Sequence, residues 1–115
     1  MESILTSTKK LAGIAEEYTH FDPDIIMFIN SNFLEMKQMG VGPEEGFVIE
    51  DENATWDEFI PDNAVMREAA KTLMGAKVRL KFDPPTMTSV LTALQNTVRE
   101  AEWRLCTEAE LTKQV

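Results

Sequence analysis

The sequence contains few of the residue types that most enzyme chemistry uses. Its 115 residues include one histidine and one cysteine, His20 and Cys106. Glycine-rich nucleotide-binding loops and zinc-binding sets of cysteine and histidine are absent. A lone cysteine forms no internal disulfide, and His20 has no serine or cysteine nearby in sequence with which to form a catalytic set. We therefore expect no enzyme activity, no metal and no cofactor.

Long hydrophobic runs are also missing. The longest uninterrupted apolar stretch is IIMFI, at residues 25–29, which is far shorter than the roughly 20 residues that cross a bilayer. The first residues, MESILTSTKK, lack the basic leader and apolar core of an export signal. We therefore expect a soluble, unexported protein with no membrane partner.

The chain carries few positive charges. It has 11 basic and 20 acidic side chains, and its net charge is −9. This balance argues against ordinary nucleic-acid binding and favours proteins or cations as partners. The hydrophobic fraction of 43% is typical of globular proteins. A chain of this length suits one modest core, so we predict a single helical domain over residues 1–115.

Helical spacing of apolar residues recurs along the chain and predicts a mainly α fold, a compact bundle of about four helices. Ser3 is expected to cap the first helix. Asp22, followed by Pro23, is expected to cap a second helix that ends near Met39, before Gly40. Asp62 is expected to cap the third helix.

Two similar tetrapeptides interrupt this pattern of helical spacing. They are FDPD at residues 21–24 and FDPP at residues 82–85. In each, an aspartate and a proline suit the start of a helix, so we interpret both as helix boundaries and not as an internal repeat. The fourth helix should begin at residues 85–88 and bury a stripe that consists of Met87, Val90 or Leu91, Leu94, Val98, Ala101 and Leu105.

The middle of the chain lacks the helical spacing of apolar residues that is found on either side of it. The segment GVGPEEG is rich in chain-turning residues, and FVIEDENATW places a short β-prone run before a polar turn. We predict an acidic middle loop or a small β-hairpin there. Thr55 and Glu58 have the spacing of a capping box, which predicts one short helical turn after it.

Acidic residues crowd this middle segment, and no lysine or arginine occurs between Glu44 and Asp62. A calcium loop does not fit, because Trp56 occupies the position where such a loop needs glycine. The segment is either a solvated loop or an electrostatic surface. The acids of this segment that we single out are Glu44, Glu45, Glu50, Asp51, Glu52, Asp57 and Glu58.

Basic residues gather instead on the third helix, as Arg67, Lys71, Lys77, Arg79 and Lys81. These side chains either pair with the acidic loop of the same chain or favour head-to-tail contacts between copies. Near the C-terminus, Trp103 either covers the base of the acidic loop or anchors a partner. Residues from about 106 to 115 form a possible flexible tail.

The order and spacing of several segments carry a resemblance to a known family. These segments are ILTSTKKLAGIAEEYTHFDPDIIMFIN, GVGPEEGFVIEDENATWDEFI, KVRLKFDPPTMTSVLTAL and EAEWRL, which together cover nearly the whole chain. The sequence resembles the small head-to-tail connector proteins, or head-completion adaptors, of tailed bacteriophages and prophages. It departs from them in REAAKTLMGAK, where the relatives carry bulkier apolar residues.

The resemblance implies a structural virion protein that is made in the host cytoplasm and lies in the neck between capsid and tail. It implies a ring of copies, usually dodecameric, below the portal protein, with a tail-side connector or stopper protein on the other side and DNA only in transit. It also implies that the C-terminal region binds the portal, which assigns portal contact to Trp103, Arg104, Leu105, Leu111 and Val115.

The physical role expected for the acids is independent of the resemblance. In a ring, a channel wall that binds phosphate would stall the passage of DNA, whereas carboxylates would not hold it. We therefore expect the seven acids singled out above to face the channel or the basic helix of a neighbouring copy. The rival hypothesis is an acidic DNA mimic that inhibits a host nuclease or repressor. Against that hypothesis stand the high apolar content and the cluster of basic residues on one helix.

Overall fold

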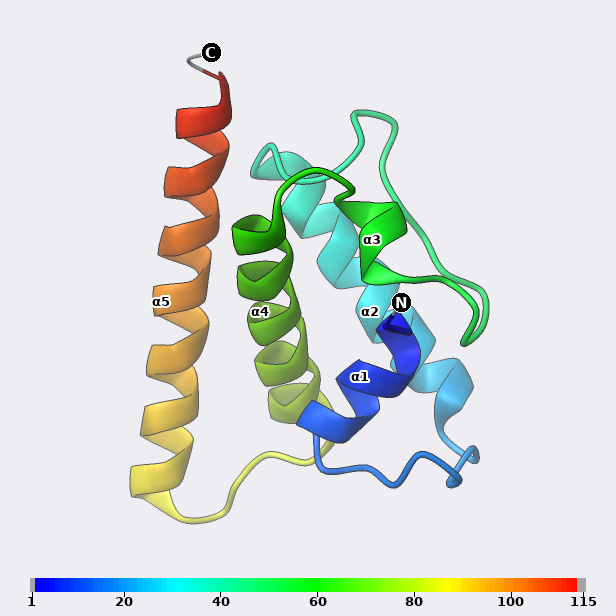
Figure 1. The fold of residues 1–115 in the computed structure, drawn as a ribbon. Helices are drawn as coiled ribbons and strands as arrows, with labels where there is room; N and C mark the ends of the chain where they lie inside the picture. The colour runs from blue at the N-terminus through cyan, green and yellow to red at the C-terminus, as the bar shows by residue number, and fades with distance from the viewer. Residues whose placement is uncertain (1, 114–115) are drawn as a thin grey trace.

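The computed structural model describes residues 2–113, and these residues form five α-helices. The long helix α4 lies at the centre and packs against α5 on one side and against α1 and α2 on the other (Figure 1). The prediction of a mainly helical bundle is confirmed, with the predicted single turn present as a fifth, short helix. The elements are α1 (Ile4–Leu11), α2 (Asp22–Gln38), α3 (Trp56–Phe59), α4 (Ala64–Phe82) and α5 (Thr88–Lys113).

Two of the predicted helix caps are present. The side chain of Ser3 accepts a hydrogen bond from the backbone N–H of Thr6 at 3.2 Å, which satisfies one of the free donors in the first turn of α1. At α3, the Thr55 hydroxyl accepts from the Glu58 backbone and the Glu58 carboxylate accepts from the Thr55 backbone. These reciprocal bonds form a complete capping box.

The two predicted aspartate caps are wrong. Asp22 is already the first residue of α2, and its carboxylate lies 2.9 Å from the ammonium of Lys9 instead of capping the helix. At α4, the residue after Asp62 is the cap, because the Asn63 side chain accepts from the Met66 backbone at 3.0 Å. The backbone of Asn63 is extended, as a capping residue requires.

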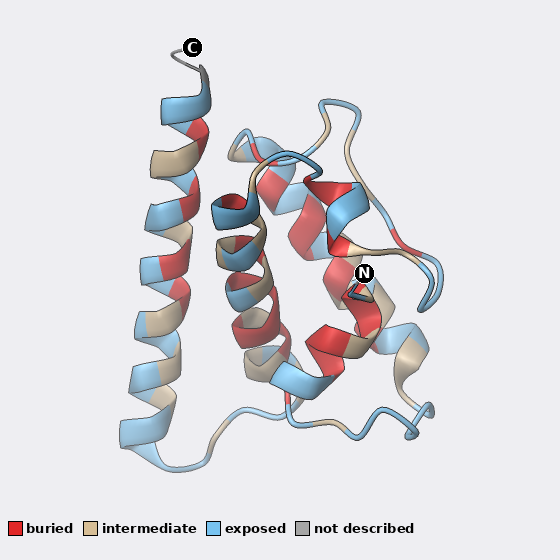
Figure 2. Ribbon diagram, in the orientation of Figure 1, coloured by how far each residue is buried: buried red, intermediate tan, exposed pale blue. Residues whose placement is uncertain are grey.

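Buried residues line the facing sides of the helices, including α5 (Figure 2). The part of this core between α1, α2, α3 and α4 is built around four aromatic rings. Phe33 is at its centre and contacts the rings of Phe47, Trp56 and Phe59 at centroid distances of 5.3, 6.1 and 4.5 Å. The indole N–H of Trp56 donates to the Ser7 hydroxyl at 2.7 Å, so this buried polar group is satisfied.

The middle segment follows a defined path without forming a hairpin, so that alternative of the prediction is wrong for the described residues. The side chain of Asn30 donates to the carbonyl of Ile49 and accepts from its N–H, at 3.0 and 2.8 Å. These bonds take the backbone groups that a partner strand would have used. At its end, the segment is fixed by an isolated bridge between Ser3 and Thr55.

Lys9 is a buried cation that holds the connection between α1 and α2. The residue is only 2% exposed. Its ammonium donates to the carbonyl oxygens of Glu16 and Tyr18, at 2.9 and 2.7 Å, and pairs with Asp22. A buried ammonium with three acceptors is satisfied. Lys9 therefore holds Glu16, Tyr18 and Asp22 close together in this connection.

Only part of the apolar stripe predicted on α5 is buried. Val98, Ala101 and Leu105 are in the core, whereas Met87 and Val90 are exposed. At a rise of about 1.5 Å per residue, α5 is roughly 39 Å long and α4 roughly 28 Å. The shorter helix cannot cover the whole stripe, and the first turns of α5 keep apolar surface in solvent (Figure 2).

Candidate interaction surfaces

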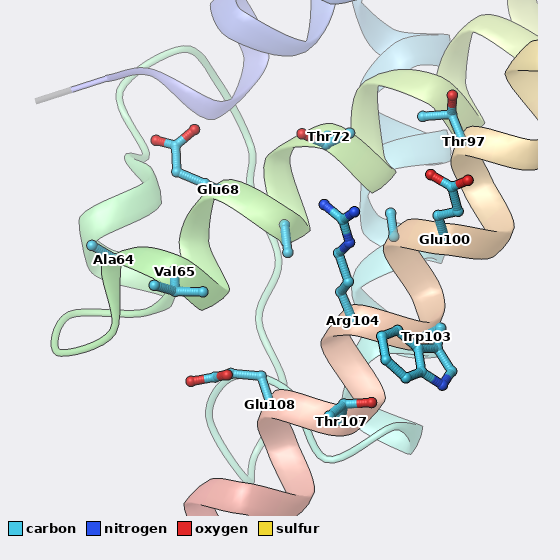
Figure 3. Close-up of a pocket in the computed structure, with 12 residues that line it drawn as sticks. Ala64, Val65, Glu68, Thr72, Thr97, Glu100, Trp103, Arg104, Thr107 and Glu108 are labelled. Atoms are coloured by element: carbon cyan, nitrogen blue, oxygen red, sulfur yellow. The ribbon is translucent and has the colours of Figure 1, made fainter.

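A groove with a volume of about 710 Å³ lies between α4 and α5. Its side chains come from two helices that face each other, and Arg104 extends from α5 toward α4 (Figure 3). We call it the α4–α5 groove. The α4 wall consists of Ala64, Val65, Glu68, Ala69 and Thr72, and the α5 wall of Thr97, Glu100, Ala101, Trp103, Arg104, Thr107 and Glu108.

Small side chains explain why this groove is open. Ala69 and Ala101 lie on the facing sides of the two helices and cannot fill the space between them. The groove also carries two large apolar side chains that remain in solvent, since Val65 and Trp103 are each 68% exposed. Exposed apolar side chains next to a groove are typical of a surface that binds another molecule.

The groove carries more negative than positive charge. Its carboxylates are Glu68, Glu100 and Glu108, and its only cation among the described lining residues is Arg104. Asn63 donates to Glu108 at 3.2 Å, and Lys71 lies 3.7 Å from Glu68. The Glu100 carboxylate forms no side-chain hydrogen bond or ion pair with other described residues, so its charge is available to a partner.

The C-terminal residues predicted to bind a partner differ in accessibility. Trp103, Arg104 and Leu111 are exposed on α5. Leu105 is fully buried in the core, so it positions its neighbours and cannot make a direct contact in this conformation. Val115 lies outside the described residues.

Trp103 does not cover the base of the acidic loop. That place is taken by Ala109 and Thr112, which line a smaller hollow together with Phe59 and Asp62. The covering role that the sequence left open for Trp103 is therefore wrong, and its contact with a partner stays a prediction. No local pattern indicates the groove itself, because Ala69 and Ala101 look like ordinary members of buried apolar stripes.

A second exposed apolar surface lies on the other side of α4. Met27 and Leu34 are seven residues apart, two turns along the outer face of α2, and Val48 of the middle segment is exposed next to them. We call these three residues the α2 patch. A hollow of about 220 Å³ beside Leu34 and Val48 also includes Lys37 and Glu45.

The seven acids predicted to form a charged surface are all exposed. Two of them take part in local structure, because Glu58 completes the capping box and Asp51 accepts from the Asn53 backbone at 2.9 Å. None forms an ion pair with a lysine or arginine among residues 2–113. The middle segment therefore carries its negative charge uncompensated.

The basic residues of α4 find partners elsewhere in the chain. Arg67 donates to the carbonyl oxygens of Ile60 and Pro61, and Lys77 pairs with Glu35 of α2. Lys71 donates to the carboxylate of Glu2, and this hydrogen bond raises the pKa of Lys71. Only Arg79 and Lys81 have neither an ion pair nor a side-chain hydrogen bond with described residues.

Membrane spans and metal sites are both absent from the described part of the chain. Residues 2–113 contain no helix with the length and hydropathy of a membrane span. Over the same residues, histidine, cysteine, aspartate and glutamate side chains form no group of three or more with the geometry of a metal site. The features that distinguish this surface are the groove, the α2 patch and the acidic middle segment.

Comparison with known proteins gives one match. Residues 4–112 match the family model described as "Phage connector protein". The match spans all of the first four helices and all but the last residue of α5. No curated protein and no solved structure matches significantly.

Proposed function

This chain belongs to the phage connector protein family, and we propose that it forms a ring below the portal protein, through which it joins the capsid to the tail. The family places it among structural components of the neck of the phage particle. The observation that carries this function is the match itself, which extends over residues 4–112 of a chain of 115. A connector needs no catalytic machinery, because its work is to hold other proteins together.

On the capsid side, we propose that the portal protein contacts α5 through Trp103, Arg104 and Leu111. These side chains project from one helix and are exposed. Tryptophan and arginine are the residue types most often found at the energetic centre of protein interfaces. On the tail side, a further connector or a stopper protein is the expected partner.

The proposed ring consists of copies of this chain and is dodecameric by its resemblance to other connectors. A closed ring needs heterologous contacts, in which two different surfaces of each copy meet. The acidic middle segment and the basic C-terminal end of α4 are two such surfaces, because they are opposite in charge. Arg79 and Lys81, which have no described ion-pair partner, are available to meet acids of the neighbouring copy.

The acids of the middle segment are proposed to face the channel or the next copy. Their support is that all seven are exposed and unpaired with described cations. DNA carries about one negative charge per 1.7 Å of its axis, so a carboxylate-lined wall repels it and leaves it free to pass. In this proposal, DNA passes through the ring without being bound by it.

Immunogold labelling of purified particles tests the proposal, after mass spectrometry has identified the chain in them. Gold at the junction of capsid and tail is expected. Absence of the chain from mature particles, together with inhibition of a host nuclease by the free protein, would favour the acidic DNA mimic and contradict the connector role.

A further inference from the structure

The α4–α5 groove has a chemistry that specifies what it binds. Its floor is made of alanine and threonine side chains, and its rim carries Val65 and Trp103, both largely exposed. A hollow of about 710 Å³ is large enough to take one or more bulky side chains. Apolar anchors that fill such hollows contribute most of the binding energy in protein interfaces.

The charges around the groove indicate the sign of the charge that the partner segment carries. Three carboxylates and one guanidinium give the lining a formal charge of −2. They come from both helices, with Glu68 on α4 and Glu100 and Glu108 on α5, so a segment lying along the groove passes close to both sides. A cationic segment would be attracted there, and an acidic one would be repelled.

Glu100 and Trp103 are three residues apart on α5, which places them on the same face of the helix. A lysine or arginine that pairs with Glu100 would also come near the indole ring of Trp103, where a cation–π contact adds to the attraction. The carboxylate of Glu100 and the indole ring of Trp103 would thus both attract the same basic side chain of a partner.

We propose that the α4–α5 groove receives a segment of the portal protein in which a bulky apolar side chain is followed, within about one helical turn, by a lysine or arginine. This inference rests on the proposed function and refines it, because it replaces a general contact with the C-terminal region by a groove of defined chemistry. The groove is bounded as much by α4 as by α5, so residues of α4 take part in portal binding.

The apolar part of the proposal is tested with a matched pair of variants. Val65→Asp introduces a charge at the groove rim, and Val48→Asp introduces the same charge on the α2 patch, at a valine that is 69% exposed against 68% for Val65. Binding of each full-length variant to the purified portal protein of the same phage is measured by biolayer interferometry. Val65→Asp should weaken binding about thirtyfold, as expected at an interface hot spot, and Val48→Asp should leave it unchanged.

The electrostatic part is tested with Glu100→Lys and, as control, Glu110→Lys, which makes the same change on an exposed part of α5 outside the groove lining. Glu100→Lys should weaken portal binding about tenfold at low salt and by much less at high salt, because ions screen the interaction. Glu110→Lys should have a smaller effect. Circular dichroism of all four variants checks that they remain folded.

The outcomes separate the inference from the function on which it rests. Unchanged portal affinity in both groove variants would overturn the inference and leave the connector role intact. Weaker self-association with unchanged portal binding would also overturn it, because the occupant of the groove would then be a second copy. Failure of the wild-type protein to bind portal would contradict both.

Discussion

The two tryptophans of the chain lie in regions of opposite character. Trp56 is 2% exposed, packs against Phe33 and Phe59, and has its N–H bonded to Ser7. Trp103 is 68% exposed on the rim of a groove and makes none of these contacts. In the first region, polar and apolar groups are satisfied within the chain. In the second, apolar surface and charge remain available for a partner.

The same contrast extends to the helices around each tryptophan. On the side of α1, α2 and α3, side chains such as Lys9 and Asn30 fix loops by binding backbone atoms. On the α5 side, the contact with α4 is made by small residues such as Ala101 and leaves a hollow beside them. A small connector can therefore keep a stable body on one side and an adaptable binding surface on the other.

Replacing each tryptophan with alanine should give the largest difference in stability between the two regions. Trp56→Ala removes a buried ring and leaves a cavity, so the free energy of unfolding should fall by about 3–5 kcal/mol. Trp103→Ala should change it by less than about 0.5 kcal/mol, because the side chain is largely in solvent. Urea denaturation followed by circular dichroism measures both. Equal losses in the two variants would show that the groove is part of the stabilising core.

The neighbouring lysines of α1 provide a second matched pair. Lys9→Met leaves Asp22 without its cation and two carbonyl oxygens without their donor, so we expect a loss of about 3 kcal/mol. Lys10→Met changes an exposed side chain and should have almost no effect. The same urea titration compares them. A Lys9→Met variant as stable as wild type would mean that this connection contributes little to the fold.

Gly75 tests how closely the stable side is packed. A Cβ atom at this position would lie 2.6 Å from the Cβ of Leu11, so α1 and α4 would have to move apart. Alanine gains up to about 1 kcal/mol of helix propensity, but overpacking costs about 1–3 kcal/mol, and the net result should be a loss of about 1 kcal/mol.

A double-mutant cycle with Leu11→Gly provides the control for Gly75→Ala, because the double variant moves the Cβ atom from one helix to the other. The double variant should be more stable than the sum of the single effects predicts. Strict additivity, or a simple gain in stability from Gly75→Ala alone, would contradict the close approach of the two helices.

The smallest expected effect concerns the pair of Lys71 and Glu2. Lys71→Met should lower the free energy of unfolding by less than about 1 kcal/mol, because both side chains are partly in solvent. The hydrogen bond to Glu2 raises the pKa of Lys71 above its ordinary value of 10.5. The contribution is therefore complete below pH 10.5 and disappears as the pH rises through the pKa of the folded state. A difference between variant and wild type that persists in stronger alkali would show another cause.

Local signals in the sequence were sufficient for some elements of this fold. The bonds of Ser3 and of the Thr55 and Glu58 capping box join residues only three positions apart, so spacing alone predicted them. The turn at Gly40, where φ is +85°, likewise depends on the one residue that adopts this conformation without strain.

Other features depended on contacts between distant parts of the chain, and the sequence predicted them wrongly or not at all. Asp22 looked like a cap but pairs with Lys9, and the extended run before Glu50 looked like a strand but is bonded by Asn30. The groove arises where Ala69 and Ala101 face each other across two helices. Periodicity identifies such alanines as apolar and cannot show the space left between them.

A density map of the neck of the phage particle, obtained by electron cryo-microscopy, tests the division into a stable body and a binding side most directly. We predict that portal density contacts Trp103 and Val65 and enters the α4–α5 groove with a basic side chain near Glu100. A map in which the portal contacts the α2 patch while the groove faces solvent would contradict this account.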